Sequence, residues 1–386
     1  MIVLRLILWV SLGLLLYTYV GYPLLAALAG ISRRHRKDRL ASAAVPTVAL
    51  VVVARNEEKW IRRRIENALE LVYPGEKLQI IIYSDASTDD TDAIVEEFGR
   101  ERVLLVRGEQ QIGQAHGQAA AIEATDAEIV VFSDANTLFE PDALRHLVAP
   151  FVDPSVGCVV GSLRYREPGT PRTAEGIYWR YEEWLKAAES RLGACVSGTG
   201  AIYAIRAGMH RTTDQRAPSD FYLPLIQAAD GTRILYEPRA IAEEEATGGV
   251  WAEARRHTRT AEGGAFCLLR VPEVRRLLHP IRFPRLAWQL GSHKVIRWLT
   301  ALWLLLALPA SALLFRQGPV YVAVSAGFAA LLVLAAWGLV ETLLRRRRLS
   351  ALPRMSLFFL VVSGAMLVGF IRALYGASRA TWEPQR

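Results

Sequence analysis

Four long apolar segments constrain the fold of this 386-residue chain more than any other feature of its sequence. Residues 2–30 are apolar apart from Arg5, and three further apolar segments cover residues 298–315, 320–340 and 356–375. An α-helix of about 20 apolar residues is long enough to cross the hydrocarbon core of a bilayer. We therefore expect an N-terminal transmembrane anchor over residues 1–30 and about three C-terminal transmembrane helices within residues 295–376.

Basic clusters beside these segments predict the orientation of the chain. Two clusters account for the whole net charge of +8: Arg33, Arg34, Arg36, Lys37 and Arg39 with Asp38 among them, and Arg345–Arg348. Such clusters mark the cytoplasmic side of a membrane helix. A secretory signal peptide would have a shorter apolar core with its basic residues in front. We predict a multi-pass protein of the cell (inner) membrane, with residues 41–270 in the cytoplasm. The last apolar segment has two possible paths, because crossing there would leave Arg379 and Arg386 outside.

The basic excess does not point to nucleic acid, and the cysteines do not point to a metal site. No basic stripe interleaved with aromatic residues runs through the sequence, so no nucleic-acid partner is expected. Cys158, Cys195 and Cys267 are too few and too scattered for a disulfide framework or a zinc site. We expect all three to be small core residues.

Residues 41–270 have the composition of a soluble α/β domain. Short apolar, β-branched runs predict strands over residues 48–53, 78–83, 103–106 and 129–132. Helical segments are expected between them over residues 57–71, 91–98 and 115–124. This alternation is typical of a doubly wound sheet with parallel strands. Residues 271–294 mix Arg with Leu, Phe and Trp and contain Pro280 and Pro284, which predicts a segment in the membrane interface.

Acidic, amide and hydroxyl side chains follow three of the predicted strands. The chain reads Ala54-Arg55-Asn56-Glu57 after the first strand, Ser84-Asp85-Ala86-Ser87-Thr88-Asp89-Asp90 after the second, and Ser133-Asp134-Ala135-Asn136-Thr137 after the fourth. The carboxyl ends of parallel strands meet at one edge of a sheet, where open α/β proteins bind ligands. A crevice lined by acids needs a cationic or hydrogen-bond-donating ligand. A divalent metal that carries a diphosphate, with a ribose or base beside it, meets this need.

These residues resemble the motifs of membrane-bound family 2 glycosyltransferases. The resemblance continues through Pro141-Asp142-Ala143-Leu144, Ser197-Gly198-Thr199-Gly200, Ser219-Asp220 and Arg256-x-x-Arg259, and covers about residues 46–270. The flanking membrane segments are similar to those of polysaccharide and exopolysaccharide enzymes related to cellulose, chitin and hyaluronan synthases. The resemblance implies a GT-A fold (a nucleotide-diphospho-sugar transferase domain) between transmembrane helices. It also implies inverting sugar transfer from a nucleotide-diphosphate donor, with UDP as the expected nucleotide.

The resemblance assigns the donor side of the site. Ala54, Asn56, Glu57 and Asp85 would line the nucleotide pocket. Asp134, with Asn136, would hold Mg²⁺ or Mn²⁺, which bind carboxylate and phosphate oxygens. Three arginines are candidates for neutralising the diphosphate: Arg206, Arg256 and Arg259.

The acceptor side is assigned in the same way. Asp220 would be the base that takes the proton of the acceptor hydroxyl, and it also precedes an apolar helix that it could cap. Gly198, Thr199 and Gly200 would approach the acceptor, because glycine lets a backbone come close to a sugar.

The chain departs from the family pattern at several positions. The family commonly has Asp-x-Asp where this chain ends in Asn136, a second acid where it has Ser219, and Lys where it has Gln114. Processive synthases carry Gln-x-x-Arg-Trp, whereas residues 256–260 read Arg-His-Thr-Arg-Thr. The missing Trp would stack on a sugar in the acceptor site, so its absence favours non-processive transfer.

Three functional classes are compared on this basis. The first is a glycosyltransferase that extends a cell-surface or exopolysaccharide chain, with transfer of a single sugar to a polyprenyl-phosphate or lipid-linked acceptor as its variant. The second is a catalytically weak scaffold subunit that works with other polysaccharide-assembly proteins, which the Asn136 and Ser219 changes motivate. The third, a nicotinamide-dependent oxidoreductase, is excluded because no Gly-x-Gly-x-x-Gly turn follows the first strand. Membrane lipid, a nucleotide-sugar donor and a glycan or lipid-linked acceptor are the expected partners.

Overall fold

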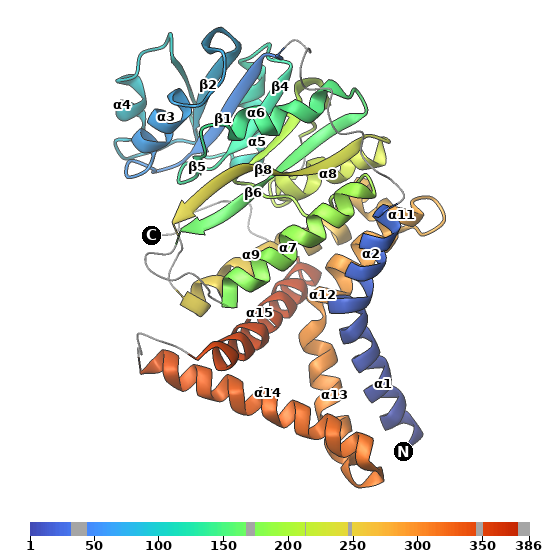
Figure 1. Ribbon diagram of the computed structural model, residues 1–386. Helices are drawn as coiled ribbons and strands as arrows, with labels where there is room; N and C mark the ends of the chain where they lie inside the picture. Colours follow the sequence, from blue (N-terminus) through green and yellow to red (C-terminus); the bar gives the residue numbers. More distant parts are fainter. Residues whose placement is uncertain (32–44, 167–173, 213, 246–248, 345–349, 377–386) are drawn as a thin grey trace.

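A computed structural model describes residues 1–31, 45–166, 174–212, 214–245, 249–344 and 350–376. An α/β domain lies at one end of the molecule and a group of long helices at the other (Figure 1). The two basic clusters that predict the orientation, together with Arg379 and Arg386, lie outside the described residues.

The core of the domain is a mixed sheet whose eight strands have the order β3-β2-β1-β4-β7-β6-β8-β5. Four strands are parallel to one another: β1 (Val48–Ala54), β2 (Leu78–Ser84), β3 (Val103–Arg107) and β4 (Ile129–Ser133). These confirm the four predicted strands. The second half of the sheet was not predicted. There β7 (Tyr203–Arg206) runs antiparallel to β4 and to β6 (Val156–Arg166), β8 (Arg233–Glu245) runs parallel to β6, and β5 (Leu138–Phe139) runs antiparallel to β8.

Alternate residues of the central strands fill two cores, one on each face of the sheet, because successive side chains of a strand point to opposite faces. Val48, Leu50 and Val52 of β1 lie in the core covered by α3 (Ile61–Leu69), α4 (Thr91–Glu96) and α6 (Ala143–Val148). Ala49 and Val51 lie in the opposite core, which is covered by α5 (Gln114–Glu123), α8 (Ser219–Ala229) and α9 (Gly249–Arg270). The predicted helices at residues 57–71, 91–98 and 115–124 correspond to α3, α4 and α5. α3 and α4 are shorter than predicted, and α5 is shifted by one residue towards the N-terminus.

Two helices of the domain lie between the sheet and the long apolar helices, α9 and α7 (Ala174–Arg191) (Figure 1). The N-terminal segment bends at a π-helical turn, Tyr17–Gly21, between α1 (Ile2–Leu16) and α2 (Tyr22–Ile31). Tyr22 and Ala26 of α2 pack against Leu185, Ala188 and Leu192 at the end of α7. The N-terminal segment is therefore fixed directly to the α/β domain.

Four helical segments of the described chain are long and apolar enough to cross a membrane. They are Ile2–Ile31, Thr300–Gln317, which contains α13 (Thr300–Leu314), α14 (Pro319–Leu343) and α15 (Ala351–Leu374). α1 packs on α13 through Leu8, which contacts Ala307, Ala310 and Leu314. Short helical pieces join α9 to α13: α10 (Pro272–Arg275), a 3₁₀ turn at Arg276–Leu278, α11 (Pro284–Gln289), a π-helix at Leu290–Val295 and α12 (Ile296–Trp298). Further 3₁₀ turns cover Gly75–Lys77, Ala149–Val152, Ala207–Met209 and Phe315–Gln317.

The last apolar helix, α15, runs along α9 of the α/β domain (Figure 1). A Cβ atom added to Gly369 would lie 2.3 Å from the carbonyl oxygen of Thr258 and 2.9 Å from the backbone nitrogen of Glu262. The Arg270 guanidinium donates to the carbonyl of Leu374 at the end of the helix, over 2.8 Å. The backbone of α15, near the C-terminal end of that helix, is thus in close contact with α9 of the α/β domain.

Gly369→Ala tests this contact. The added methyl group would overlap backbone atoms of α9, so we expect a loss of about 1–3 kcal/mol of stability, the usual cost of overpacking. Thermal unfolding of the detergent-solubilised protein measures it. Gly364→Ala is the matched control in the same helix, because nothing lies within 4 Å of a Cβ at that position. Equal melting temperatures for the two variants would contradict the close approach of α15 to α9.

Candidate active site

The loops at the carboxyl ends of β1 and β2 are held together by polar contacts. Asp85 is only 3% exposed and accepts hydrogen bonds from the backbone N–H groups of Ile112 (2.7 Å) and Gly113 (3.0 Å). The Arg55 guanidinium donates to the carbonyls of Asp85 and Ala86. Asp85 therefore fixes the loop that precedes α5, in addition to any contact with a ligand.

Two residues of these loops have a left-handed backbone, Asn56 with φ 53° and Ala86 with φ 54°. This conformation is uncommon for residues other than glycine, and for alanine no side-chain hydrogen bond offsets its cost. The Asn56 Oδ1 atom accepts a hydrogen bond from the backbone N–H of Thr88 over 2.8 Å. Ala54 is fully buried, and its carbonyl accepts from the N–H of Asp85. Of the predicted nucleotide-pocket residues, Ala54, Asn56 and Asp85 thus lie together at one edge of the sheet.

Asp134, at the end of β4, is the centre of a group of acids from four parts of the chain. Burial and the charges of Glu244, Asp220 and Glu57 raise its pKa to about 7, while Arg259 acts in the opposite direction. Gln114, which stands where many family members have Lys, donates from Nε2 to Asp134 Oδ1 over 3.1 Å. Asp134 and Asp220 were both predicted, and the structure places them within electrostatic reach of each other.

Glu244 of β8 is a member of this group that the sequence did not reveal. Burial raises its pKa, and it accepts a hydrogen bond from Thr137 Oγ1 over 2.6 Å. Thr137 belongs to the loop that carries Asp134 and Asn136. A weak signal was present, since Glu243, Glu244 and Glu245 end a long strand. Nothing in the spacing of the sequence places the end of that strand beside the loop that follows β4.

The acids around Asp134 fit a divalent cation that is shared with phosphate. Among the described residues, no three His, Cys, Asp or Glu side chains converge on one point to hold a metal by themselves. Mg²⁺ and similar cations are commonly held by one or two carboxylates together with substrate phosphate oxygens. Asp134, partly buried and repelled by neighbouring carboxylates, suits this mode of binding, and Asn136 lies two residues away in the same loop.

Asp220 lies in the first turn of α8 against the predicted glycine loop. A Cβ atom on Gly198 would lie 1.7 Å from the carbonyl oxygen of Asp220, and one on Gly200 would lie 3.5 Å from its Oδ2 atom. Burial raises the pKa of the Asp220 carboxyl, whereas backbone hydrogen bonds, one of them from Gly200, and the charges of Lys294 and Lys186 lower it. Glycine is required at position 198 by the close passage of the loop over Asp220, whereas a Cβ atom at position 200 would make an ordinary van der Waals contact.

The three predicted diphosphate-binding arginines lie in different places. Arg259 faces Asp134 and Glu244, as its effect on both pKa values shows. Arg256 pairs with Glu253 and lies over the rings of Trp179 (4.7 Å) and Tyr165 (5.5 Å).

The prediction that Arg206 neutralises the diphosphate is wrong. It pairs with Ile129 at the start of β4, at the edge of the sheet opposite to Asp134. Its guanidinium donates to the carbonyls of Phe151, Asp153 and Val156. The antiparallel course of β7, which the sequence did not predict, is the reason.

A cavity of about 650 Å³ lies at that opposite edge, beside the starts of β1 and β2. Its lining includes Thr47, Lys77, Arg100 and Arg102. The predicted donor residues lie at the other ends of the same strands.

Comparisons with known proteins agree with this arrangement. Residues 49–208 match the family described as Glycosyl transferase family 2. The poly-β-1,6-N-acetyl-D-glucosamine synthase of Staphylococcus epidermidis is 28% identical over 240 residues, which are 58% of this chain and 56% of the relative. A β-monoglucosyldiacylglycerol synthase of Nostoc sp. is 31% identical over 163 residues, 41% of this chain and 34% of the relative. The chain spans about half the length of the curated relatives it matches.

One solved structure matches the chain almost from end to end. The mannosyltransferase PcManGT from Pyrobaculum calidifontis, in complex with GDP-Man and Mn²⁺, superposes with a TM-score of 0.67 over 96% of this chain and 99% of its own. At 21% sequence identity, this likeness concerns the fold. The chain has a GT-A fold with additional helices at both ends that are long and apolar enough to span a membrane.

Glu57 provides a test of the electrostatics of the site. Burial and the nearby charge of Asp89 raise its pKa from 4.5 to about 7. The stability that this carboxyl contributes is therefore full below pH 4.5 and is lost as the pH rises through 7, with a limit of roughly 3 kcal/mol. Because Glu57→Gln has no carboxyl to ionise there, its thermal unfolding temperature should fall less than that of the wild type between pH 5 and pH 8.5. Glu58→Gln, at an exposed neighbour, should follow the wild type. The same pH dependence in all three proteins would contradict a buried Glu57 carboxyl.

Proposed function

We propose, from the membership of residues 49–208 in glycosyl transferase family 2, that this protein transfers a sugar from a nucleotide-diphosphate donor to an acceptor at the membrane surface. The observation that carries the proposal is that Asp134, at the carboxyl edge of the sheet, lies within electrostatic reach of Glu244 and Asp220, on the same edge as the left-handed loop residues Asn56 and Ala86. Acids that are buried near one another call for a cation, and a metal that carries a diphosphate supplies one.

The donor is proposed to lie over the ends of β1, β2 and β4. Ala54, Asn56, Glu57 and Asp85 would surround the nucleotide. Asp134 and Asn136 would hold Mg²⁺ or Mn²⁺ against the diphosphate, and Arg259 would add positive charge beside it. A bound metal would supply Lewis-acid stabilisation of the departing nucleotide diphosphate.

Asp220 is proposed as the catalytic base. The oxygen of an acceptor hydroxyl attacks the anomeric carbon, its proton passes to the Asp220 carboxylate, and the bond from that carbon to the diphosphate oxygen breaks. Attack on the face opposite the leaving group inverts the anomeric carbon. A catalytic base works best when its pKa is near the pH of the medium, and burial raises the pKa of Asp220 above that of an ordinary aspartate. Gly198, Thr199 and Gly200 would guide the acceptor to it.

The acceptor is proposed to be either a cell-surface or exopolysaccharide glycan or a lipid-linked molecule. The relatives include both a polysaccharide synthase and a glucosyldiacylglycerol synthase by name. The apolar helices of the described chain offer little polar surface for a polymer channel, which supports short-range transfer.

The location is proposed to be the cell (inner) membrane, with residues 41–270 on the cytoplasmic side. The basic clusters at residues 33–39 and 345–348 support this orientation by the positive-inside rule. A nucleotide-sugar donor made in the cytoplasm would then reach the site directly.

Nucleotide diphosphate release from a panel of nucleotide sugars tests the proposal. We expect release with one donor in the presence of Mn²⁺ or Mg²⁺, and its loss when the metal is removed by a chelator. Asp220→Asn removes the base and should lower the rate by about 10²–10⁴-fold. Asp134→Ala should abolish the metal dependence together with the activity.

Asp230→Asn is the matched control. Asp230 follows the last residue of the same helix α8, is exposed and pairs with Arg211, so its loss should leave the rate unchanged. Absence of release with every donor, or full activity of Asp220→Asn, would favour the scaffold function instead.

A further inference from the structure

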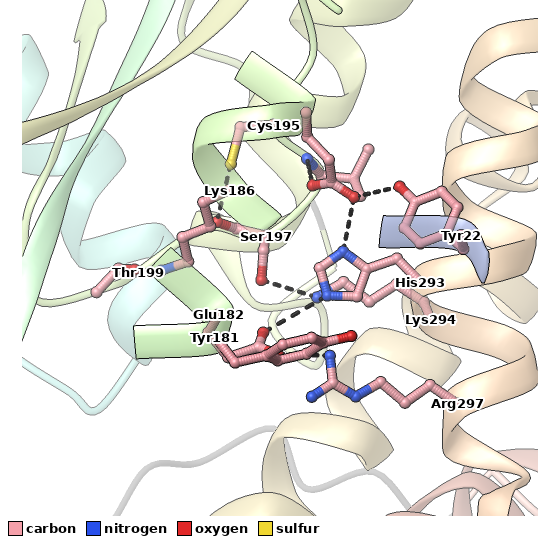
Figure 2. A network of polar contacts seen from close by, with 12 residues as sticks. Tyr22, Tyr181, Glu182, Lys186, Cys195, Ser197, Thr199, His293, Lys294 and Arg297 are labelled. Atoms are coloured by element: carbon pink, nitrogen blue, oxygen red, sulfur yellow. Dashed lines mark hydrogen bonds and ion pairs between the residues drawn. The ribbon is translucent and has the colours of Figure 1, made fainter. Parts of the chain in front are cut away.

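Lysine is rare in this chain, and two of its lysines lie together beside the proposed base. Only five of the 46 basic residues are lysines: Lys37, Lys59, Lys77, Lys186 and Lys294. Lys186 is 7% exposed and lies on α7, whereas Lys294 is half-buried and lies in the π-helix at Leu290–Val295. Figure 2 shows both side chains directed at the segment that contains Ser197 and Thr199.

Both ammonium groups have hydroxyl partners in place of carboxylates. Lys186 Nζ donates to Thr199 Oγ1 over 2.6 Å, and Lys294 Nζ donates to Ser197 Oγ over 3.0 Å. No carboxylate of the described residues lies within ion-pair distance of either nitrogen. Each ammonium group has three donors, so both retain hydrogen-bonding capacity for a further acceptor.

The nearby carboxylates have other partners. Glu182 forms an ion pair with Arg297 at 2.6 Å. Glu189, which is fully buried, accepts from the Tyr22 hydroxyl (2.5 Å) and lies 2.7 Å from His293 Nδ1. Asp220 is within electrostatic reach of both lysines but forms no ion pair with them. Among the described residues, the hydrogen-bond partners of the two ammonium groups are therefore hydroxyl groups (Figure 2), and the rings of Tyr236 and Phe221 lie 5.8 Å from Lys186 Nζ and Lys294 Nζ.

Such a group of donors suits a phosphate. The Ser197 and Thr199 hydroxyls accept from the lysines and can donate their own hydrogens to an anion. Gly198 lies between them in sequence, and its backbone packs against the carbonyl of Asp220. Lysine binds phosphate as a point charge, and burial makes the interaction stronger than it would be in water.

The residues around the two lysines are of the types that are typical of a membrane interface. Lys294 precedes the apolar segment that begins at Thr300 by six residues, which is about 9 Å along a helix and close to the depth of the headgroup layer. Tyr17 and Tyr19 of the N-terminal segment bond to Ser292 and Thr300, and Trp288 donates to the Tyr17 hydroxyl. Tyr and Trp are enriched at this level of membrane proteins.

We propose that Lys186 and Lys294, with Ser197 and Thr199, bind the phosphate group of a lipid-linked acceptor and thereby hold its reactive end at Asp220. This inference rests on the proposed function, because it specifies the acceptor of that reaction. The donor lies on the Asp134 side of Asp220, and the lysines lie on the side of the membrane helices. The base is then between the two substrates.

Binding of a simple lipid phosphate to the full-length detergent-solubilised protein tests the site without requiring sugar transfer. Dodecyl phosphate, dodecanol and inorganic phosphate are compared by the rise in melting temperature that each produces. We expect dodecyl phosphate to stabilise the wild type, inorganic phosphate to bind at least tenfold more weakly, and dodecanol to have no effect. Lys186→Met and Lys294→Met should each weaken dodecyl phosphate binding at least tenfold.

Lys77→Met is the matched control, because Lys77 is distant from the loop and donates to the carbonyl of Val45. The methionine variants remove a charge but keep an apolar chain of similar length, and their melting temperatures without ligand report whether they fold. In a transfer assay, both should raise the acceptor KM and leave the donor KM unchanged.

Four results would overturn the inference. Unchanged dodecyl phosphate binding in folded Lys186→Met and Lys294→Met would remove the lysines from the site. If dodecanol bound as tightly as dodecyl phosphate, the site would not recognise the phosphate group. If inorganic phosphate bound as tightly, the site would bind a free anion and not a lipid phosphate. If the two lysine variants bound dodecyl phosphate normally but had a shifted pH profile of nucleotide diphosphate release, the lysines would act only on the pKa of Asp220. A protein that binds dodecyl phosphate but releases no nucleotide diphosphate would contradict the proposed function and leave this binding site in place.

Discussion

The buried carboxylate of Glu189 holds the apolar N-terminal segment, the segment before α13 and the α/β domain in one arrangement. It accepts hydrogen bonds from the Tyr22 hydroxyl of α2 and from the backbone N–H of Val196, and it contacts the His293 ring. These three partners come from the N-terminal segment, the loop after α7 and the segment before α13. A fully buried carboxylate is costly unless its oxygens have hydrogen-bond partners, so removing any one of these partners is expected to destabilise the arrangement.

The position of the acceptor loop follows from this contact. The Val196 N–H that bonds to Glu189 begins the segment that continues through Gly198 to Gly200, and that segment passes directly over Asp220. Asp220, the proposed base, is thus placed relative to the long apolar helices by the same residues that join the two parts of the protein. The edge proposed to bind the donor is placed independently, by the parallel strands β1, β2 and β4. The candidate site lies where these two frameworks meet.

The sequence predicted the half of the site that depends on local pattern. Apolar runs located β1 to β4, and the acids that follow them located Asp85 and Asp134. Contacts between distant segments were missed. Glu244 lies beside the Asp134 loop because β8 pairs with β5 and β6, and His293 lies 104 residues from its partner Glu189. Spacing along a chain does not report such pairings. Arg206 was misplaced because β7 is antiparallel. The burial of Lys186 was not predicted, because the position of a residue along a helix does not by itself distinguish a buried side chain from an exposed one.

The central claim is that the donor binds at the carboxyl edge of the sheet, on the side of Asp220 away from the lysines. A structure of the protein in a lipid nanodisc with UDP and Mg²⁺ tests it most directly. The account predicts a metal ion about 2.1 Å from an Asp134 carboxylate oxygen, with diphosphate oxygens completing its ligands. A nucleotide bound instead in the cavity beside the starts of β1 and β2, which Lys77, Arg100 and Arg102 line together with Glu76, Glu101, Glu123 and Asp126, would contradict it.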